Sequence, residues 1–283
     1  MLSPKVSQRH LAVLLNTMLK HERFPATVRV LDMGCGDAHM LAYLAHQLPA
    51  WNPDHTFEFY GFEVGDIGWR GDGYLTPTID FLSQHAPGHQ WQDRVAVSSA
   101  LDRWPYEPAS FEVIISNQVL EHVRDHALVF AEIRRCLAPN GVSVHLFPVR
   151  EVLWEAHAHM PLVHKVRNPS RRERLMLFFA KLGFTSKYKD ELPLYGWRSL
   201  QEFAAKYSDI LGRMTNYLSS GEIKKLANSA GLRVDFSYTT NFFSTKLLSM
   251  MRRTPELYGS PTWVDKVVFL ALKRVASVTL ILR

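Results

Sequence analysis

The sequence has little cysteine and no long uncharged apolar run. Its 283 residues include only two cysteines, Cys35 and Cys136, which excludes a disulfide-stapled fold and makes a reducing cytoplasm the simplest setting. The apolar segment 267–282 is interrupted by Lys273 and Arg274, so no stretch reaches the roughly 20 residues that a membrane span requires. We therefore expect a cytoplasmic protein without a membrane span.

The sequence also lacks the signatures of nucleic-acid binding. It contains no zinc knuckle, no repeated alternation of aromatic and basic residues, and no recognisable RNA-binding module. Its formal net charge of +6 is modest for this length, and hydrophobic residues make up 47% of the chain, enough for a full core. We expect an enzyme-sized globular fold and no nucleic-acid partner.

The most informative segment is 28–37, which reads Val-Arg-Val-Leu-Asp-Met-Gly-Cys-Gly-Asp. This pattern predicts a buried strand that feeds a glycine turn and then a helix. Gly34 and Gly36 allow backbone to approach a ligand where a Cβ would clash, and the N–H groups at the helix start attract polar or anionic groups. The segment therefore predicts a nucleotide-cofactor site, although such a turn taken alone also fits a purely structural role.

A helix is expected directly after this turn. Leu41, Leu44 and Leu48 repeat at helical spacing, Asp37 is a suitable cap, and Pro49 is expected to end the helix. A strand followed by a glycine turn and then a helix is the order of elements at a cofactor site beside the first strand of an α/β sheet.

The next predicted strand, residues 57–63, ends in an acid. The carboxylate of Glu63 can accept both hydroxyls of a ribose. A dinucleotide pyrophosphate needs a third glycine, whereas Asp37 and Ala38 follow Gly36, and the added acid disfavours a phosphate. These features favour a nucleoside cofactor without a pyrophosphate.

With these two strands the chain resembles the class I S-adenosylmethionine-dependent methyltransferases. In that family the first strand ends in an acidic-x-Gly-x-Gly turn and the second strand ends in an acid. Residues 104–117 resemble the family's passage into strand four, and the Glu121–His122 pair matches the turn that the family places beside the methyl group. Two departures are Ala38, where a third glycine is common, and Ala100, where an acid often contacts the adenine amine. A narrower resemblance, to methyltransferases of sugar and polysaccharide biosynthesis, rests on His145-x-Phe-Pro and the later Glu-x-His.

The resemblance and the order of predicted elements imply an α/β fold. We expect a Rossmann-like, seven-stranded methyltransferase sheet with helices on both faces and an inserted substrate or lid region. A helix over 220–230 begins at Ser219 or Ser220 and stops at Gly231, and the last strand inserts antiparallel between the fifth and sixth. The remaining predicted strands are 94–98, 111–117, 142–147, 232–238 and 277–282, with helices over 125–137 and from 267 to about 274.

The chain divides into three predicted parts. Residues 1–147 form the cofactor-binding core with an N-terminal helix, residues 148–218 form the inserted substrate-recognition region, and residues 219–283 complete the core. A second insertion, residues 65–93, is rich in glycine and is predicted to be a mobile loop.

The family resemblance implies S-adenosylmethionine as cofactor and S-adenosylhomocysteine as product. Cys35 is interpreted as a small residue that fills the tight turn rather than as a nucleophile. The implied cofactor contacts are Asp32, Gly34, Cys35 and Gly36 for the amino-acid end, Glu63 for the ribose, Ala100 and Leu101 for the adenine, and Asn117 and Gln118 for the methionine portion.

Histidines supply the candidate general base. His122 has the best position, after strand four, while His157 with Glu155 competes for the same role. Glu155, His157 and His159 could also ligate a metal, but no further ligand can be named, so we expect no metal site.

The acceptor is the least constrained part of the prediction. We expect a small molecule or glycan, with O-methylation of a sugar, glycan or polysaccharide precursor preferred. The alternatives are N-methylation, methylation of a quinone or other small metabolite, and a non-catalytic S-adenosylmethionine-binding protein. An anionic acceptor is suggested by the cations Lys165, Arg167, Arg171, Arg172 and Arg174, which could equally form a solvated face.

Overall fold

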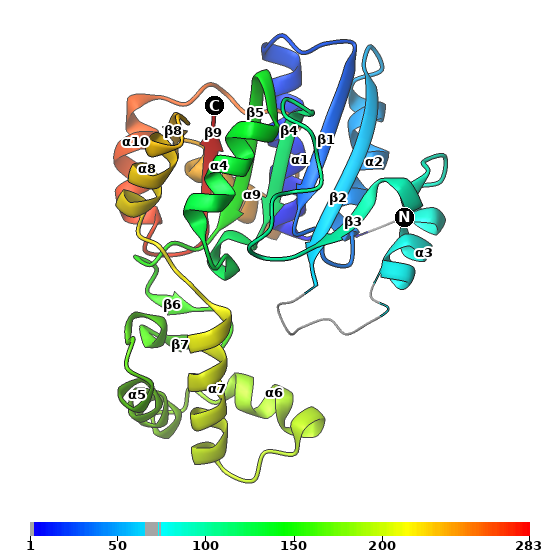
Figure 1. The fold of residues 1–283 in the computed structure, drawn as a ribbon. Coiled ribbons are helices and arrows are strands. Elements are labelled where there is room, and N and C mark those ends of the chain that lie inside the picture. Colours follow the sequence, from blue (N-terminus) through cyan, green and yellow to red (C-terminus); the bar gives the residue numbers. More distant parts are fainter. Residues whose placement is uncertain (1–2, 66–72, 74) are drawn as a thin grey trace.

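The centre of the molecule is a seven-stranded mixed sheet, shown in the computed structural model of Figure 1. The structure describes residues 3–65, 73 and 75–283. The strands of this sheet are β1 (Thr27–Met33), β2 (Thr56–Val64), β3 (Val95–Ser98), β4 (Phe111–Asn117), β5 (Leu137–Phe147), β8 (Val234–Asp235) and β9 (Val278–Leu282).

The sheet has the order β3-β2-β1-β4-β5-β9-β8. The first five strands in this order run parallel, and β9 lies antiparallel between β5 and β8. This topology confirms the seven-stranded methyltransferase sheet and the antiparallel insertion of the last strand.

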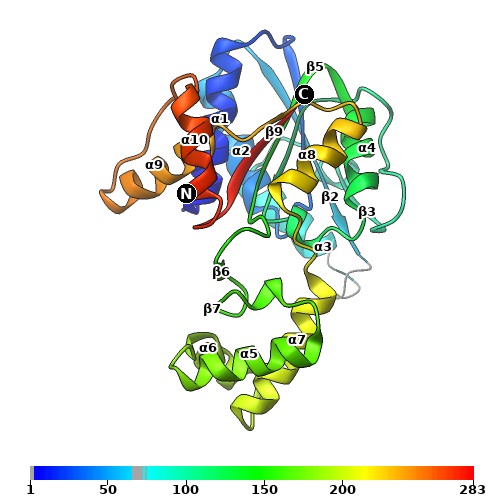
Figure 2. The ribbon, with the colours of Figure 1, turned by 90° about the vertical axis from the view of Figure 1, so that its left-hand side faces the viewer.

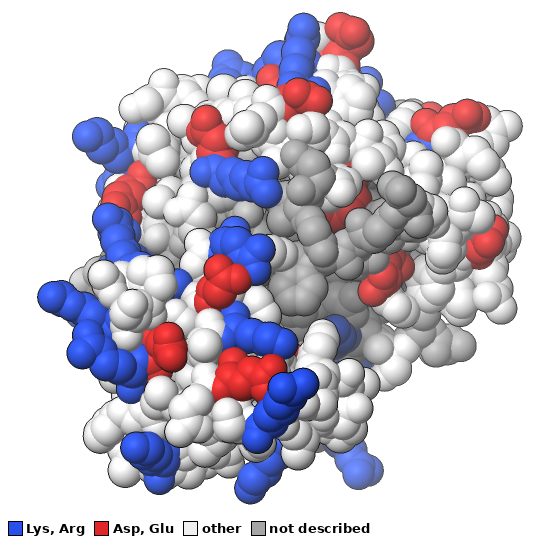
Figure 3. Space-filling view, turned by 60° about the horizontal axis from the view of Figure 1, so that its bottom comes forward, with Lys and Arg blue, Asp and Glu red and all other residues white. Residues whose placement is uncertain are grey.

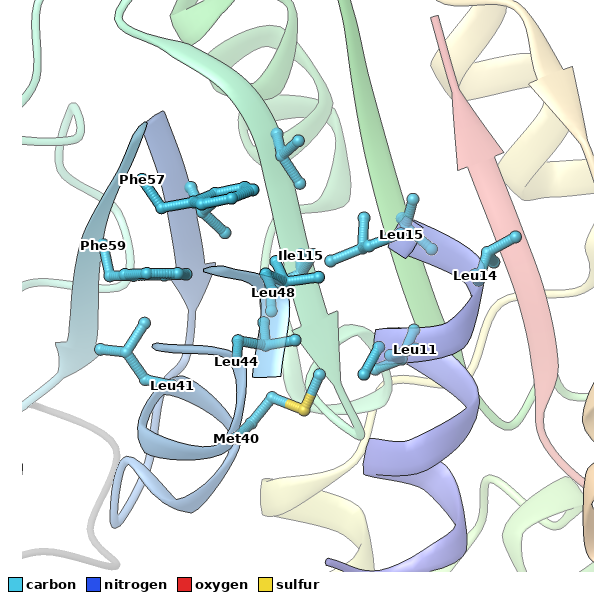
Figure 4. Close-up of a cluster of buried hydrophobic side chains, with 14 of the residues drawn as sticks. Leu11, Leu14, Leu15, Met40, Leu41, Leu44, Leu48, Phe57, Phe59 and Ile115 are labelled. Atoms are coloured by element: carbon cyan, nitrogen blue, oxygen red, sulfur yellow. The ribbon is translucent and has the colours of Figure 1, made fainter. Parts of the chain in front are cut away.

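Helices cover both faces of the sheet. On one face, Leu11 and Leu15 of the first helix and Leu44 of the second belong to one buried cluster with Phe59 and Ile115 of the sheet (Figure 4). The helices of this face are α1 (Val6–His21), α2 (His39–Trp51), α3 (Leu75–His85) and α9 (Thr239–Met250), and those of the other are α4 (His126–Cys136), α8 (Ser220–Ser229) and α10 (Trp263–Leu272).

A helical lobe follows β5 and lies below the sheet in Figures 1 and 2. Because β5 leads directly into it and runs parallel to β1, β2 and β4, the lobe lies at the carboxyl ends of these strands. Met176, Trp197 and Phe203 belong to a separate hydrophobic cluster within the lobe. Its elements are β6 (Trp154–Glu155), β7 (Met160–Pro161), α5 (Pro169–Lys181), α6 (Ser186–Tyr195) and α7 (Leu200–Met214).

Two details of α2 differ from the prediction. The residue before α2 is Ala38, not Asp37, and it takes a left-handed conformation with φ of 55°. This conformation explains why glycine is common at this position in the family. Pro49 lies inside the last turn and does not end the helix, which continues to Trp51 and is closed by the N–H of Asn52 donating to the carbonyl of Leu48.

Elsewhere, polar side chains set boundaries that the apolar pattern missed. The predicted strand 232–238 shrinks to β8, since Asp235 accepts hydrogen bonds from the N–H and hydroxyl of Ser237 and turns the chain. Helix α10 begins at Trp263, earlier than predicted, because Thr262 and Asp265 form a capping box.

The predicted loop 65–93 contains a helix, α3, and a buried Trp91 whose indole N–H donates to the carbonyl of Ala86. The prediction of a mobile loop was therefore wrong for residues 75–93. Gly68 and Gly71, on which that expectation rested, lie outside the described residues. Within the described part of the chain, no helix is both long and apolar enough to cross a membrane.

Candidate functional site

A pocket of about 640 Å³ opens at the carboxyl ends of the parallel strands. Its size is typical of a small-molecule cofactor site. The predicted site residues that line it are Asp32, Gly34, Cys35, Gly36, Glu63, Ala100, Asn117, Gln118, His122 and His157. Two predicted residues do not line it: Leu101 is 59% exposed, and Glu155 lies buried behind His157.

The glycine turn is held against the end of β2. The N–H groups of Gly34 and Cys35 both donate to the carbonyl of Phe62, at 2.9 and 3.1 Å. Gly34 has φ of +70°, and a Cβ placed there would come within 2.8 Å of both methyl groups of Val119. Glycine is therefore required at position 34 by backbone conformation and by the close approach of the segment after β4.

Two buried oxygens at this pocket have no hydrogen-bond partner among the described residues. They are Oδ2 of Asp32 and Oδ1 of Asn117. Burial, with the added charge of Glu63, raises the pKa of Asp32 well above its usual value. Acceptors left unpaired in a buried site are costly, so the site fits a ligand that presents donors or positive charge here.

Glu63 lies at the same edge and already orders the turn. One of its carboxylate oxygens accepts the N–H of Gly36 at 2.8 Å, and the other accepts the N–H of Val64 at 2.9 Å. Since each carboxylate oxygen has a second lone pair, Glu63 can still accept hydrogen bonds from a ligand.

Glu155 and His157 form a hydrogen-bonded pair at the pocket wall. Oε1 of the fully buried Glu155 lies 2.6 Å from Nδ1 of His157 and 2.9 Å from the hydroxyl of Tyr217, while the N–H of Ala158 donates to Oε2. Burial opposes charge at both residues, but the hydrogen bonds and the imidazole lower the pKa of Glu155, and Glu155 raises the pKa of His157. The proton of His157 is thereby fixed at Nδ1, which leaves Nε2 as the basic position.

His122 is anchored differently. Its Nδ1 lies 2.7 Å from the carbonyl oxygen of Met214, which can only accept, so Nδ1 carries the proton. Burial lowers the pKa of His122 and favours the neutral form. The rings of His122 and His157 meet edge to face with centroids 5.1 Å apart, so the structure brings both predicted bases to one place.

A cavity of about 120 Å³ extends from these histidines into the lobe. His122 and His157 line both this cavity and the larger pocket. Its other lining residues are Lys187, Glu191, Tyr207, Ile210, Leu211, Met214 and Thr215. The two histidines thus separate a cofactor-sized pocket from a smaller space formed by α6 and α7.

Glu121 and Tyr217 belong to this site, although neither was predicted to bind the cofactor or to take part in the reaction. Glu121 is buried with Oε2 unpartnered among the described residues, and burial raises its pKa to about 8. Its backbone carbonyl accepts the N–H of Asn216 at 2.7 Å, which ties the chain returning from the lobe to the His122 turn. The Glu-His pair of the family resemblance had already pointed to the turn that contains Glu121, whereas nothing in the local sequence marks Tyr217.

The basic stretch does not form one site. Arg172 is buried, with its guanidinium donating to the backbone carbonyls of Ser208 and Val166, so its assignment to an anionic acceptor was wrong. Lys165, Arg167, Arg171 and Arg174 are exposed, and among described residues none of them lines either cavity. Figure 3 shows basic and acidic side chains interspersed over the face that includes the lobe.

The possible metal ligands Glu155, His157 and His159 all form hydrogen bonds within the protein. Glu155 bonds to His157, and Nδ1 of His159 lies 3.1 Å from the hydroxyl of Ser186. Across residues 3–65, 73 and 75–283, no three His, Cys, Asp or Glu side chains gather in a way that could hold a metal.

Comparison with known proteins gives the same fold. A family model described as "Methyltransferase domain" matches residues 6–235. No curated protein matches the sequence. Similar solved structures include PKMT2 from Rickettsia typhi, with a TM-score of 0.50 and 11% identity over 99% of this chain and 54% of that chain.

Two others are an S-adenosylmethionine-dependent methyltransferase from Mesorhizobium loti and a geranyl diphosphate C-methyltransferase from Streptomyces coelicolor in complex with S-adenosyl-L-homocysteine. The first has a TM-score of 0.44 and 12% identity over 92% of this chain and 93% of that chain. The second has a TM-score of 0.46 and 14% identity over 98% and 74% of the two chains. At these identities the likeness concerns the fold alone.

Proposed function

The chain belongs to the S-adenosylmethionine-dependent methyltransferases, and we propose that it methylates a hydroxyl oxygen of a sugar, glycan or polysaccharide precursor. The observation that carries the proposal is the pair formed by the buried Glu155 and the half-buried His157 at the boundary of the two cavities. A hydroxyl must lose its proton when its oxygen is methylated, whereas a neutral amine can attack before it loses one. A positioned base is therefore of most use to an oxygen acceptor.

Residues of the larger pocket hold the cofactor in this proposal. The unpartnered oxygens of Asp32 and Asn117 accept from its amino-acid portion, Glu63 accepts from its ribose, and the segment around Ala100 lies along its adenine. When bound, S-adenosylmethionine supplies a methyl group on a positively charged sulfur. The role of the protein is then to align an oxygen with that group and to receive its proton.

We assign proton acceptance to Nε2 of His157. The imidazolium that forms there is stabilised by the adjacent Glu155 carboxylate, whose orientation is fixed by Ala158 and Tyr217. His122, preferred from sequence, remains neutral and has no carboxylate partner among the described residues, so we assign it to orienting the acceptor through its own Nε2. A base oriented by a buried carboxylate is an arrangement well suited to general-base catalysis.

The smaller cavity suits a sugar ring. Ile210, Leu211 and Met214 offer an apolar surface for the C–H groups of the ring. On the polar side, Lys187 and Glu191 form an ion pair of 2.8 Å that places donors and acceptors side by side, as hydroxyls need. Because Glu191 neutralises Lys187, this end of the cavity favours a neutral polyhydroxylated group over a bare anion.

The test is methyl transfer from labelled S-adenosylmethionine to a panel of sugars, sugar nucleotides, glycans, amines and quinones, with mass spectrometry of the products. We expect an O-methyl ether on a sugar, lost in His157→Gln and retained in His159→Gln. Transfer to an amine or a quinone, with the same rate in both variants, would overturn the proposal.

A further inference from the structure

The outer side of α9 and α10 carries a concentration of exposed apolar side chains. Met250 is 82% exposed, Trp263 75% and Leu247 62%, although residues of these types are usually buried. We call this surface the apolar face; its members are Leu247, Met250, Met251, Leu257, Trp263, Val264, Val267, Val268, Leu270 and Val275.

The apolar face is not the core side of these helices. Phe242 of α9 and Phe269 of α10 point inward and are buried, and Phe269 stacks on Phe236 with ring centroids 4.7 Å apart. Trp263, Val267 and Leu270 recur at helical spacing on the opposite side of α10. A helix that buries one apolar side and exposes another has a second surface to cover.

The charges around the apolar face are mainly positive. Its exposed cations are Lys246, Arg252, Arg253, Lys266 and Arg274, and none of them forms an ion pair with a carboxylate among the described residues. Of the two acids in residues 246–275, Asp265 is engaged by Thr262 and Thr240, which leaves Glu256. The unopposed cations favour a negatively charged partner surface.

We propose that the apolar face docks on the surface of an anionic lipid membrane, with α9 and α10 lying in the plane of the interface. Exposed aliphatic side chains, a tryptophan at one end of a helix and a rim of lysine and arginine are the features that bind such an interface. A second copy of the chain is a poorer occupant, since two apolar faces in contact would bring the same cations together.

This docking would bring the lobe close to the lipid. The N–H of Leu153 donates to the carbonyl of Arg274 at 2.8 Å, so the exposed Leu153 and Trp154 continue the apolar face onto the base of the lobe. Figure 2 shows α9 and α10 at the side of the core from which the chain passes down toward β6. The proposal rests on this surface and does not depend on the identity of the methyl acceptor.

Co-sedimentation with lipid vesicles tests the proposal. The full chain is mixed with vesicles of phosphatidylcholine containing phosphatidylglycerol, and with vesicles of phosphatidylcholine alone, at about 0.05 M and about 0.5 M salt, because screening shortens with ionic strength. We expect binding to the anionic vesicles at low salt, and a drop of about tenfold or more in partitioning for Arg252→Glu/Arg253→Glu, given about 1 kcal/mol for each cation near the surface.

Matched variants distinguish binding through the apolar face from nonspecific hydrophobic adsorption to the vesicles. Met250→Ser/Val267→Ser should lower partitioning, whereas Phe178→Ser/Leu194→Ser, which alters exposed apolar residues of the lobe, should leave it unchanged. For charge, Lys224→Glu/Lys225→Glu on α8 is the control. The proposal is overturned if the chain does not bind anionic vesicles, or if each variant and its control lower partitioning equally. It is also overturned if light scattering shows a dimer that Met250→Ser/Val267→Ser dissociates.

Discussion

Oε1 of Glu155 lies 2.6 Å from Nδ1 of His157, and this contact joins a fully buried acid to a residue that lines both cavities. The acid cannot reach the pocket itself. Its effect on the reaction must therefore pass through the protonation state and orientation of His157.

The first prediction concerns pH. Because Glu155 raises the pKa of His157, the basic form of His157 appears above the usual imidazole range. The methyl-transfer rate at saturating cofactor should rise with pH through an inflection above about 6.5. His157→Ala should lower kcat by about 10² to 10⁴, with a much smaller change in cofactor affinity by calorimetry.

Glu155→Gln distinguishes the two histidines. Loss of the carboxylate should move the inflection of the rate to lower pH if His157 is the base. An inflection already below the ordinary imidazole value, and unmoved in this variant, would return the role to His122, whose pKa burial lowers.

The second prediction concerns the cofactor. Glu63→Ala should weaken S-adenosylmethionine binding by about 2 kcal/mol, since charge-assisted hydrogen bonds to the ribose and the brace on Gly36 are lost together. Gly34→Val should abolish binding, because a side chain at this left-handed position meets Val119. Titration calorimetry measures both, with Glu58→Ala on the same strand, outside the pocket, as control. Equal affinities in all three variants would remove the turn from the cofactor site.

The third prediction concerns stability and pH. Burial raises the pKa of Glu121 to about 8 in the folded protein, from an ordinary value of 4.5. Between these values the unfolded chain releases the proton first, so the free energy of unfolding falls as pH rises from about 4.5 to about 8. Glu121→Gln should remove this loss and raise Tm most at pH 8 and least at pH 4. Thermal unfolding of the exposed Glu107→Gln variant gives the reference, which should follow the wild type throughout.

The fourth prediction separates two neighbouring arginines. Arg172→Met should destabilise the protein by about 2 kcal/mol, because the carbonyls of Ser208 and Val166 lose charged donors. The exposed Arg171→Met should change the free energy of unfolding by less than about 0.5 kcal/mol. Urea denaturation compares them, and similar midpoints for the two variants would contradict a structural role for Arg172.

Elements with both a strong apolar pattern and a local end signal were predictable from sequence. Helix α8 begins after Ser219, which forms a capping box with Glu222, and Gly231 follows it in a left-handed conformation. The glycine turn and the acid after β2 were predictable for the same reason: each depends on a few adjacent residues. These local signals located most of the larger pocket.

Contacts between distant segments could not be predicted in the same way. That Tyr217 reaches Glu155, and that Met214 anchors His122, depends on how the lobe folds back on the core. Arg172 is a further example. A cation in a charged run is expected to be exposed to solvent, and only the folded structure shows that Arg172 is buried against α7. Tertiary packing, which one sequence does not specify residue by residue, decided these roles.

The position of β9 bears on how the molecule assembles. It lies between β5 and β8, and its pairing with β5 places Ser143 opposite Leu282 and Phe147 opposite Val278. Along the chain, however, the entire lobe and three helices separate β5 from β9. Until β9 arrives, β5 has an apolar edge with unsatisfied backbone groups, which is the kind of edge that recruits strands from other molecules. Because so long a loop must close first, we expect insertion of β9 to be a slow step in folding and the stage most sensitive to aggregation.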